Sequence, residues 1–428
     1  MLAILGGRPV LDRALAPYRS MGDAELRAVQ DVVRSDVLSG YYGSAGERFL
    51  GGPVVRQLEE AWSARFGVSH AVSVNSGTSG LFAAMGAAGV SPGDEVIVPP
   101  YSMSASAMAP LVYGGVPVFV DIEPETFSLD VAAVRAAITP RTRAVLVVNL
   151  FGHPGRLAEL RALADDRGIV LIEDNAQGVL AEEHGRPAGT VGHIGVFSLN
   201  YHKHIHAGEG GMCVTNDDRL AWRLRLIRNH GENVVGDAEP ADLVNLIGFN
   251  YRMTELSAAV ALAQLRHVDA HVAGREAVGH RLTAAVRGLE GLTPPTVRQG
   301  CRHVFYVWAL RVDEERLGVP RARFSAALDA EGFPHFRGYV APLYRLPVFQ
   351  RRVAFGAHGF PFTLTDRHYT DVRCPTVERM YERELIGFES CAYTLDDVTV
   401  DALGEALRKV HAGRHELARW TGAPSPGQ

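Results

Sequence analysis

Lysine is rare in this chain, and its rarity singles out one residue. Of the 43 basic residues only Lys203 and Lys409 are lysine, and all the others are arginine, which is typical of a GC-rich genome. A buried ammonium can lose its proton and attack a carbonyl carbon, whereas a guanidinium stays protonated. Lys409 lies among basic residues near the C-terminus and is interpreted as a solvated helix charge. Lys203 is therefore the candidate for covalent chemistry on an aldehyde.

A second candidate is a cluster of small polar residues at 75–80, directly after the apolar run 70–74. The cluster opens a helical pattern, so the N–H groups of Gly77, Thr78 and Ser79 would lie at the positive end of a helix dipole. That arrangement favours a phosphate group. A plain helix cap has the same composition, and the pattern alone does not separate the two interpretations.

A third candidate site lies at the end of the apolar run 169–172, where Glu173 and Asp174 follow. A carboxylate at the carboxyl end of a strand can face a ligand. Asp174 could hold a proton on a ring nitrogen, and Gln177 could reach the edge of the same ring. The alternative is that Asp174 caps the following turn or binds a metal.

Histidines flank Lys203 at alternate positions. If the segment is extended, His202, His204 and His206 share one face and Lys203 lies on the other. A metal site would need a further carboxylate or cysteine, and the sequence at 208–211 is typical of a tight turn rather than a ligand loop. We therefore expect no metal, and interpret the histidines as packing around a buried loop.

The elements that must position these residues alternate regularly between strand and helix. Amphipathic stretches such as 78–88, 131–138 and 155–167 separate the apolar runs. This rhythm predicts an α/β fold with a mostly parallel sheet covered by helices on both faces, and ligands that bind beyond the carboxyl ends of the strands. The predicted strands are 70–74, 95–98, 116–120, 144–148, 169–172, 195–197 and 211–214.

The pattern changes after about residue 250. We expect one long helical stretch at 254–289, then the strands and helices of a smaller domain. The predicted organisation is a large cofactor-binding domain at 1–250 and a small C-terminal α+β domain at 251–428. The later elements are strands at 303–312 and 333–340 and helices at 321–330 and 400–412, with a Pro/Gly/Ser-rich, mobile tail at 422–428.

Composition excludes several classes of protein. The 428 residues carry a net charge of −5 and are 47% hydrophobic, which suits a large core and gives no basic excess for nucleic acid. The start of the chain lacks the pattern of a secretory signal, and no apolar run approaches the about 18 residues of a membrane span. The four cysteines are scattered without metal-binding spacing, which indicates reduced thiols in a cytoplasm.

Three requirements meet in one small molecule. A phosphate to anchor, a pyridine nitrogen to keep protonated and an aldehyde to hold as an imine all belong to pyridoxal 5'-phosphate. The three segments taken together therefore indicate this cofactor, with pyridoxamine 5'-phosphate as its intermediate form.

The sequence also resembles the DegT/DnrJ/StrS-type sugar aminotransferases, which have the aspartate aminotransferase-like fold, also called PLP-dependent transferase fold type I. The resemblance implies a large domain with a mixed, mostly parallel sheet between helices, and a smaller α+β domain. The matching stretches, in the family's order, are 75–79, 92–99, 117–122, 173–177, 197–203, 208–211, 226–231 and 248–255.

The resemblance also implies roles for single residues. Lys203 would be the imine-forming base, Asp174 would lie under the pyridine nitrogen and Gln177 at the ring hydroxyl. Thr78, Ser79 and Ser198 would bind the phosphate, together with Asn250 of the partner subunit of a homodimer. Candidate lining residues, each as readily structural, are Arg228, His230, Arg252, His303 and Tyr306.

Three stretches depart from the family's pattern. Met103 occupies the position at which the family usually stacks an aromatic ring on the cofactor, and Tyr101 lies two residues before it. Residues 41–52 form an insertion, and residues 384–390 replace a leucine- and proline-rich turn.

The function implied by the resemblance is transfer of an amino group from an amino acid, glutamate foremost, to a keto sugar. The expected acceptor is a nucleotide-linked keto-hexose of antibiotic or glycan biosynthesis. The start of the chain, 5–10, is similar to members that aminate cyclitol ketones, so a free keto-cyclitol is the alternative. A dehydratase on this scaffold would have histidine in place of Lys203; a non-catalytic sugar-nucleotide binder or a histidine metalloprotein would lack the aminotransferase activity.

Overall fold

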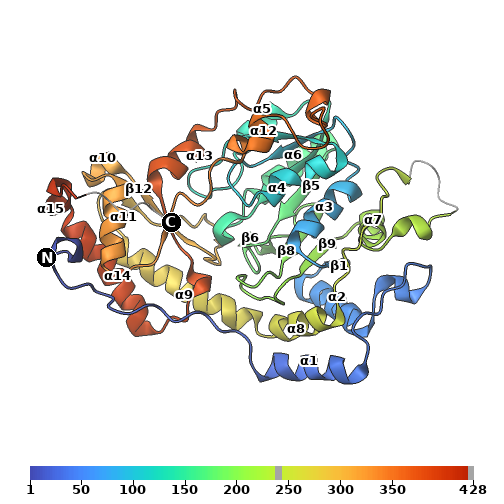
Figure 1. The fold of residues 1–428 in the computed structure, drawn as a ribbon, viewed down its shortest axis with the longest axis horizontal. Coiled ribbons are helices and arrows are strands. Elements are labelled where there is room, and N and C mark those ends of the chain that lie inside the picture. The colour runs from blue at the N-terminus through green and yellow to red at the C-terminus, as the bar shows by residue number, and fades with distance from the viewer. Residues whose placement is uncertain (237–242, 423–428) are drawn as a thin grey trace.

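A seven-stranded sheet lies at the centre of the larger part of the molecule (Figure 1), in a computed structural model that describes residues 1–236 and 243–422. The strand order is β1-β9-β8-β5-β4-β2-β3. Strand β9 is antiparallel to both neighbours, and the other adjacent pairs are parallel. The strands are β1 (His70–Val74), β2 (Glu95–Val98), β3 (Val116–Phe119), β4 (Thr142–Val148), β5 (Val170–Asp174), β8 (Ile194–Ser198) and β9 (Gly211–Thr215).

Helices cover both faces of this sheet, because the strands carry apolar side chains on both sides. In β4, Leu146 packs into the core under α3 and α7, whereas Val145 and Val147 pack into the core under α2, α6 and α8. The α/β architecture predicted from the alternating pattern is confirmed. The helices around this sheet are α1 (Asp23–Ser35), α2 (Pro53–Phe66), α3 (Gly77–Ala87), α4 (Ala105–Met108), α5 (Val131–Ala137), α6 (Leu157–Arg167), α7 (Asp218–Arg228) and α8 (Glu255–Leu265).

A second sheet, of order β10-β12-β14-β13, packs with helices α9, α11 and α14 around a separate core. Leu2 belongs to this core, and the chain then runs from it along the molecule to α1 (Figure 1). Conversely, Phe349 and Val377 pack with the core of the large sheet. The strands are β10 (Leu292–Thr293), β12 (Trp308–Val312), β13 (Phe336–Arg337) and β14 (Leu385–Phe388); the helices are α9 (Val268–Val286), α10 (Glu314–Leu317), α11 (Arg321–Ala330), α12 (Pro347–Gln350), α13 (Pro375–Arg379), α14 (Asp397–Ala412) and α15 (Arg414–Arg419).

Two details of the C-terminal half differ from the sequence expectation. The stretch 254–289 is broken at Arg266 and His267, because α8 packs on α1 and α2 while α9 packs on α14, so the chain bends between two cores. The strands are also shorter than predicted: residues 303–307 lie along Gly152 instead of pairing in the small sheet. The division of the chain at residue 250 stays a prediction, and most of the tail lies outside the described residues.

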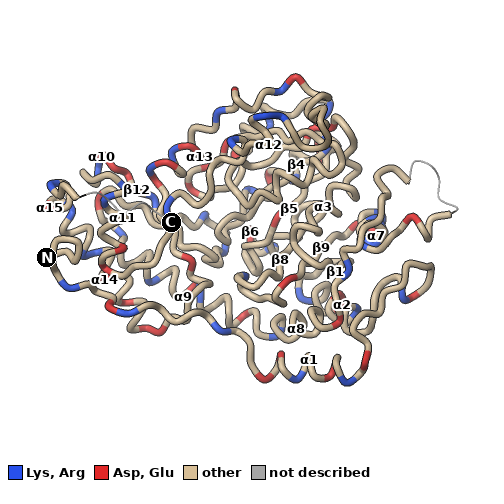
Figure 2. Tube along the Cα trace, in the orientation of Figure 1, with Lys and Arg blue, Asp and Glu red and all other residues tan. Residues whose placement is uncertain are grey.

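Charged residues of both signs are interspersed along the described part of the chain (Figure 2). A third, short sheet joins β11 (Cys301–Arg302), β6 (Glu182–Glu183) and β7 (Arg186–Pro187). Among the described helices, none combines the length and the apolar composition that crossing a membrane would require.

Candidate active site

The register of the large sheet brings three strand ends together. Val74, at the end of β1, and Ser198, at the end of β8, both pair with Gly211 of β9. Asp174, at the end of β5, pairs with Val196 of β8. The carboxyl ends of these strands therefore meet at one edge, where the sequence had predicted the ligand.

The N-terminus of α3 opens onto this edge. Ser76 caps the helix, since its hydroxyl accepts from the N–H of Ser79 at 3.0 Å. Gly77 lies against Ser198: a Cβ on Gly77 would come within 3.0 Å of the Ser198 Cβ, so the backbone approaches closely only because the side chain is absent. No hydrogen bond recorded among the described residues uses the N–H groups of Gly77 and Thr78. Two backbone donors and the Ser198 hydroxyl are therefore available to an anion.

The two carboxylates at the end of β5 point to different partners. Asp174 is buried and accepts from the Ser106 hydroxyl at 2.9 Å and from the N–H of Ala176 at 3.2 Å. Burial raises the pKa of Asp174, and these two donors oppose the rise. Glu173 instead accepts from the N–H groups of Gly189 and Val191, which fixes a loop. Only Asp174 is placed to serve a ligand.

Lys203 lies in the loop between β8 and β9 and shares the site with Asp174. Its ammonium donates to the Tyr306 hydroxyl at 3.3 Å and lies 4.7 Å from the centre of that ring. Burial lowers the pKa of Lys203, and the negative charge of Asp174 partly opposes this effect. A lysine in this setting can lose its proton more readily than an exposed one, as the sequence argument required.

The loop that carries Lys203 is a series of turns, so the extended geometry considered for it is wrong. His204 is buried with Nε2 at 3.0 Å from the Val304 carbonyl, and His206 lies 2.9 Å from the Ser20 hydroxyl. The histidines thus bind separate parts of the chain. Within residues 1–236 and 243–422 no three His, Cys, Asp or Glu side chains gather as a metal would need.

Gln177 is held at both ends of its amide. Its Oε1 accepts from the N–H of Phe151 at 2.8 Å, and its Nε2 donates to the Tyr339 hydroxyl at 3.2 Å. The negative charge of Asp174 contributes to a raised pKa of Tyr339, after the larger effect of burial. Gln177 therefore lies at the edge of the same space as Asp174.

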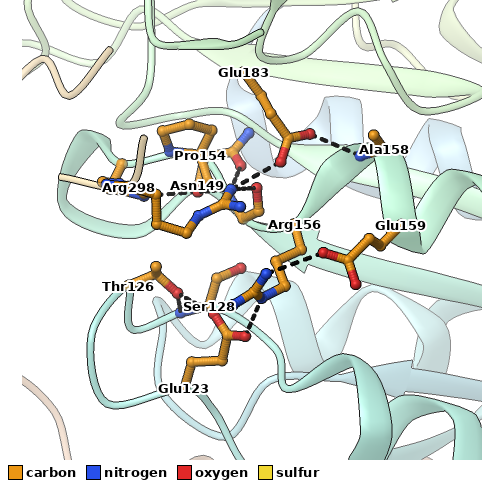
Figure 3. Close-up of polar contacts among 12 residues, drawn as sticks. Glu123, Thr126, Ser128, Asn149, Pro154, Arg156, Ala158, Glu159, Glu183 and Arg298 are labelled. Atoms are coloured by element: carbon orange, nitrogen blue, oxygen red, sulfur yellow. Dashed lines mark hydrogen bonds and ion pairs between the residues drawn. The ribbon is translucent and has the colours of Figure 1, made fainter. Parts of the chain in front are cut away.

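Arginine side chains connect the loop after β4 with neighbouring segments, including the segment at 298–307 (Figure 3). Arg298 donates to Glu183 at 2.8 Å and to the carbonyl of Pro154 at 3.3 Å, while Arg156 pairs with Glu123. The loop after β4 and the segment at 298–307 are thereby fastened side by side. Gly152 allows this approach, since a Cβ there would come within 3.0 Å of the Tyr306 nitrogen.

Four of the predicted site residues have side chains that are exposed or already hydrogen-bonded in one chain. Thr78 is exposed, and the Ser79 hydroxyl is already engaged with the Asn75 side chain at 2.6 Å. Met103 has 61% of its surface exposed. Asn250 is also exposed, and its carbonyl accepts from the Asn75 side chain at 3.3 Å, beside the start of α3. Tyr101 is buried, and its hydroxyl donates to the Gly338 carbonyl at 2.8 Å, which leaves no free ring face.

Of the candidate lining residues, Arg228 serves the fold instead. It is fully buried, forms an ion pair with Glu59 at 2.5 Å and donates to the carbonyls of Ser73 and Leu50. His303 is buried too, with its ring stacked on Phe305 at 4.1 Å between centres. Two further candidates are half-buried and bind neighbours: His230 pairs with Glu232, and Arg252 donates to Asn229.

Sequence reasoning missed two residues of the site, Ser106 and Tyr339. Ser106 binds Asp174, and Tyr339 binds Gln177. Neither lies next to a residue with recognisable chemistry, because Ser106 comes from the short helix α4 and Tyr339 from a loop of the small sheet. Only the folded chain brings them to the strand ends.

The fold and the site together define an aminotransferase built on the PLP-dependent transferase scaffold of fold type I. The model of the DegT/DnrJ/EryC1/StrS aminotransferase family matches residues 42–385, and the chain belongs to this family.

Three relatives illustrate the range of the family. The chain is 39% identical over 297 residues to the GDP-perosamine synthase of Caulobacter vibrioides, covering 69% of this chain and 78% of that one. It is 35% identical to the L-glutamine:2-deoxy-scyllo-inosose aminotransferase of Streptoalloteichus tenebrarius, covering 97% and 99%. The crystal structure of DesI with its TDP-sugar product aligns with a TM-score of 0.78 and 30% identity, covering 98% of each chain.

Proposed function

We propose that this enzyme uses pyridoxal 5'-phosphate to move an amino group from an amino acid, L-glutamate foremost, to a keto sugar. The observation that carries the proposal is a half-buried lysine, Lys203, whose charge interacts with a buried carboxylate, Asp174, at the strand ends beside the N-terminus of α3. A purely structural or binding role would not require an amine with a lowered pKa beside a buried carboxylate at this point.

The residues present fit this cofactor. The N–H groups of Gly77 and Thr78 and the Ser198 hydroxyl would hold the phosphate, as the close approach of Gly77 to Ser198 allows. Asp174 would bind the ring nitrogen, and Gln177 would lie at the ring hydroxyl. When bound, pyridoxal 5'-phosphate supplies an aldehyde that takes up the amino group and a ring that withdraws electrons. We also assign Ser79, Met103 and Asn250 to the cofactor site.

The chain's own side chains move and hold the protons. Lys203 Nζ, whose pKa is lowered by burial, would take a proton from the α-carbon of the donor in the first half of the reaction. In the second half it would deliver a proton to the carbon of the acceptor that receives the amino group, with the proton held on the cofactor between the two halves. Tyr306 orients Nζ through the 3.3 Å contact. Asp174 keeps a proton on the nitrogen it faces, and Ser106 stabilises the ionised form of Asp174.

The acceptor we propose is a nucleotide-linked keto-hexose, as the names of the perosamine synthase and of DesI suggest. A free keto-cyclitol is the second candidate. It is supported by the scyllo-inosose aminotransferase, which aligns over 97% of this chain. Biosynthesis of an antibiotic or of another amino-sugar product suits either acceptor.

We further propose a homodimer in which Asn250 of the partner subunit completes the phosphate site. Large apolar side chains are exposed close to Asn250 in the chain, which suits burial against a second copy. They are Leu243, Val244 and Ile247. The cysteines are all free, which suits a reducing cytoplasm.

Replacing the lysine tests the proposal. We expect Lys203→Arg to lose activity by at least about 10²- to 10⁴-fold and to lose the visible absorbance of bound cofactor, because a guanidinium neither gives up its proton nor forms an imine. The matched control is Lys409→Arg, at the only other lysine, which binds Glu331 and the Arg8 carbonyl far from the site. A yellow, fully active Lys203→Arg protein would refute the proposal.

A further inference from the structure

An acidic side chain reaches the site from the small sheet. Glu389 lies in the turn after β14, and the register Phe388–Trp308 places this turn beside Tyr306. Burial sets the pKa shifts of Lys203, Tyr306 and Tyr339, lowering the first and raising the other two, and the negative charge of Glu389 adds an upward contribution to the pKa of each. The contacts point to the same place. The Ser390 hydroxyl, next to Glu389, donates to the Tyr306 carbonyl at 3.4 Å, and the Tyr306 hydroxyl accepts from Lys203 at 3.3 Å, so the turn that carries Glu389 lies beside the site.

The carboxylate of Glu389 has no partner of its own. The side chain is exposed and does not cap the helical turn that follows it. Across the described part of the chain, no hydrogen bond or ion pair uses its oxygens. The acids before it in the sequence differ, since Glu382 pairs with Arg345 and Glu384 with Arg379. Glu389 is thus free to bind a ligand.

Buried groups hold the turn in place. The Ser390 hydroxyl donates to the carbonyl of Phe305, and the buried Arg275 donates to the Ser390 carbonyl at 2.6 Å. The N–H of Ala392 donates to the Glu389 carbonyl at 3.0 Å. A carboxylate on a fixed backbone can select among ligands, because its position is set before the ligand arrives.

We propose that Glu389 selects the acceptor: its two oxygens accept hydrogen bonds from neighbouring hydroxyl groups of an uncharged, polyhydroxylated ring. The inference rests on the proposed function and adds the residue that recognises the acceptor. A carboxylate accepts from two hydroxyls at once, and such charge-assisted bonds are strong. The same charge repels anions, so the carboxylates of the donor and any phosphate of the acceptor bind away from Glu389.

Glu389 also lies in the stretch, 384–390, that replaces the leucine- and proline-rich turn of the family. A leucine or proline there offers neither charge nor side-chain acceptors. The acid is therefore a feature by which this chain can differ from its relatives in the ring that it accepts.

The first experiment separates the two halves of the reaction in Glu389→Gln. Transfer from L-glutamate to the enzyme is followed by the change in visible absorbance, and transfer to a keto-cyclitol or a nucleotide-linked keto-hexose by the return of that absorbance. We expect the KM of the acceptor to rise about 10- to 100-fold, with the KM of glutamate unchanged or lower. Glu405→Gln, which changes an exposed acid on α14, is the matched control.

The second experiment needs no turnover. Acetylation of Lys203 in the full chain without added cofactor, measured against pH by mass spectrometry, reports the pKa of this lysine. Removing the nearby negative charge in Glu389→Gln should move the reaction profile to lower pH, whereas Glu405→Gln should leave it in place. An unmoved profile in Glu389→Gln would show that the carboxylate does not face the site, and would overturn the inference.

The outcomes distinguish this inference from the proposed function. If Glu389→Gln keeps the acceptor KM of the wild type, or raises the KM of glutamate instead, the inference fails while the proposed function stands. If the wild-type enzyme takes no amino group from any amino acid, the proposed function fails and the inference fails with it. Acceptors that lack one hydroxyl group identify the hydroxyl that is bound. Removal of that hydroxyl should weaken binding to the wild type but not to Glu389→Gln.

Discussion

At the scale of single residues, the site depends on two groups that burial pushes towards their neutral forms. Burial lowers the pKa of Lys203 and raises the pKa of Asp174, while the attraction between them opposes both effects. The protonation states therefore depend on the neighbours that favour the ionised carboxylate. Ser106 is the side chain that does so by a hydrogen bond.

Ser106→Ala should move the acid limb of the kcat profile to higher pH. The Ser106 hydroxyl favours the ionised carboxylate and so lowers the pKa of Asp174; without it that pKa rises, and Asp174 becomes protonated at a higher pH. A hydrogen bond to a charged group predicts a move of about 1 to 2 pH units. Measurement of kcat against pH, with Ser104→Ala as control, checks this; an unmoved acid limb would contradict the role given to Ser106.

At the scale of elements, the site depends on the segment 298–307, which carries Tyr306 and has few bonds of regular secondary structure. Neutral histidines hold it: His153 Nε2 accepts from the N–H of Arg298 at 3.1 Å, and His204 lies 3.0 Å from the Val304 carbonyl. Burial lowers the pKa of His153 to about 4 and that of His204 to about 3. As pH falls, we therefore expect this segment to loosen before the rest of the fold.

His153→Gln tests the linkage between this histidine and stability. The unfolded chain binds a proton on His153 below about pH 6.5, whereas the folded chain does so only near pH 4. The contribution of His153 to the free energy of unfolding is therefore full above about pH 6.5 and is lost as pH falls towards 4. Between pH 7 and pH 5 the wild type should lose about 2 kcal/mol more unfolding free energy than His153→Gln. Urea unfolding at both pH values measures this. His415→Gln, at an exposed histidine, should behave as the wild type; equal losses in all three proteins would count against the prediction.

At the scale of the whole molecule, one chain leaves part of the predicted site exposed. Met103 and Asn250 are exposed, and Asn250 lies beside the start of α3. Ile247, three residues before Asn250, has 67% of its surface exposed. These exposed groups are what a second copy would cover if each site were built from two chains. The proposal of a shared site can be tested without a structure of the dimer.

Mixing two inactive variants decides whether Asn250 acts across the dimer. In a mixed dimer of Lys203→Arg and Asn250→Ala, a shared site places both changes in one site and leaves the other intact. Activity should then recover to about a quarter of the wild-type value, because about half of randomly mixed dimers carry one intact site. The activity of mixtures refolded or co-expressed together measures this. No recovery would mean that Asn250 serves its own chain.

Much of this structure can be predicted from local patterns in the amino-acid sequence. The strands around the site were predicted almost to the residue, because strands buried on both faces form continuous apolar runs. Lys203, Asp174 and Gln177 were found because each follows such a run or is a rare residue type in a short polar segment. Their meeting at one edge follows from the parallel order of β1, β8 and β5.

The α/β architecture, the position of Lys203 and the chemistry it suits all follow from the amino-acid sequence, since these depend on local pattern and residue type. Folding in three dimensions adds that α8 and α9 are separate helices and that Arg228 is a buried support. It also brings Tyr306 to Lys203, Ser106 to Asp174 and Tyr339 to Gln177. The physical reason is that these roles depend on contacts between segments far apart in the chain, and such contacts leave no periodic trace in either segment.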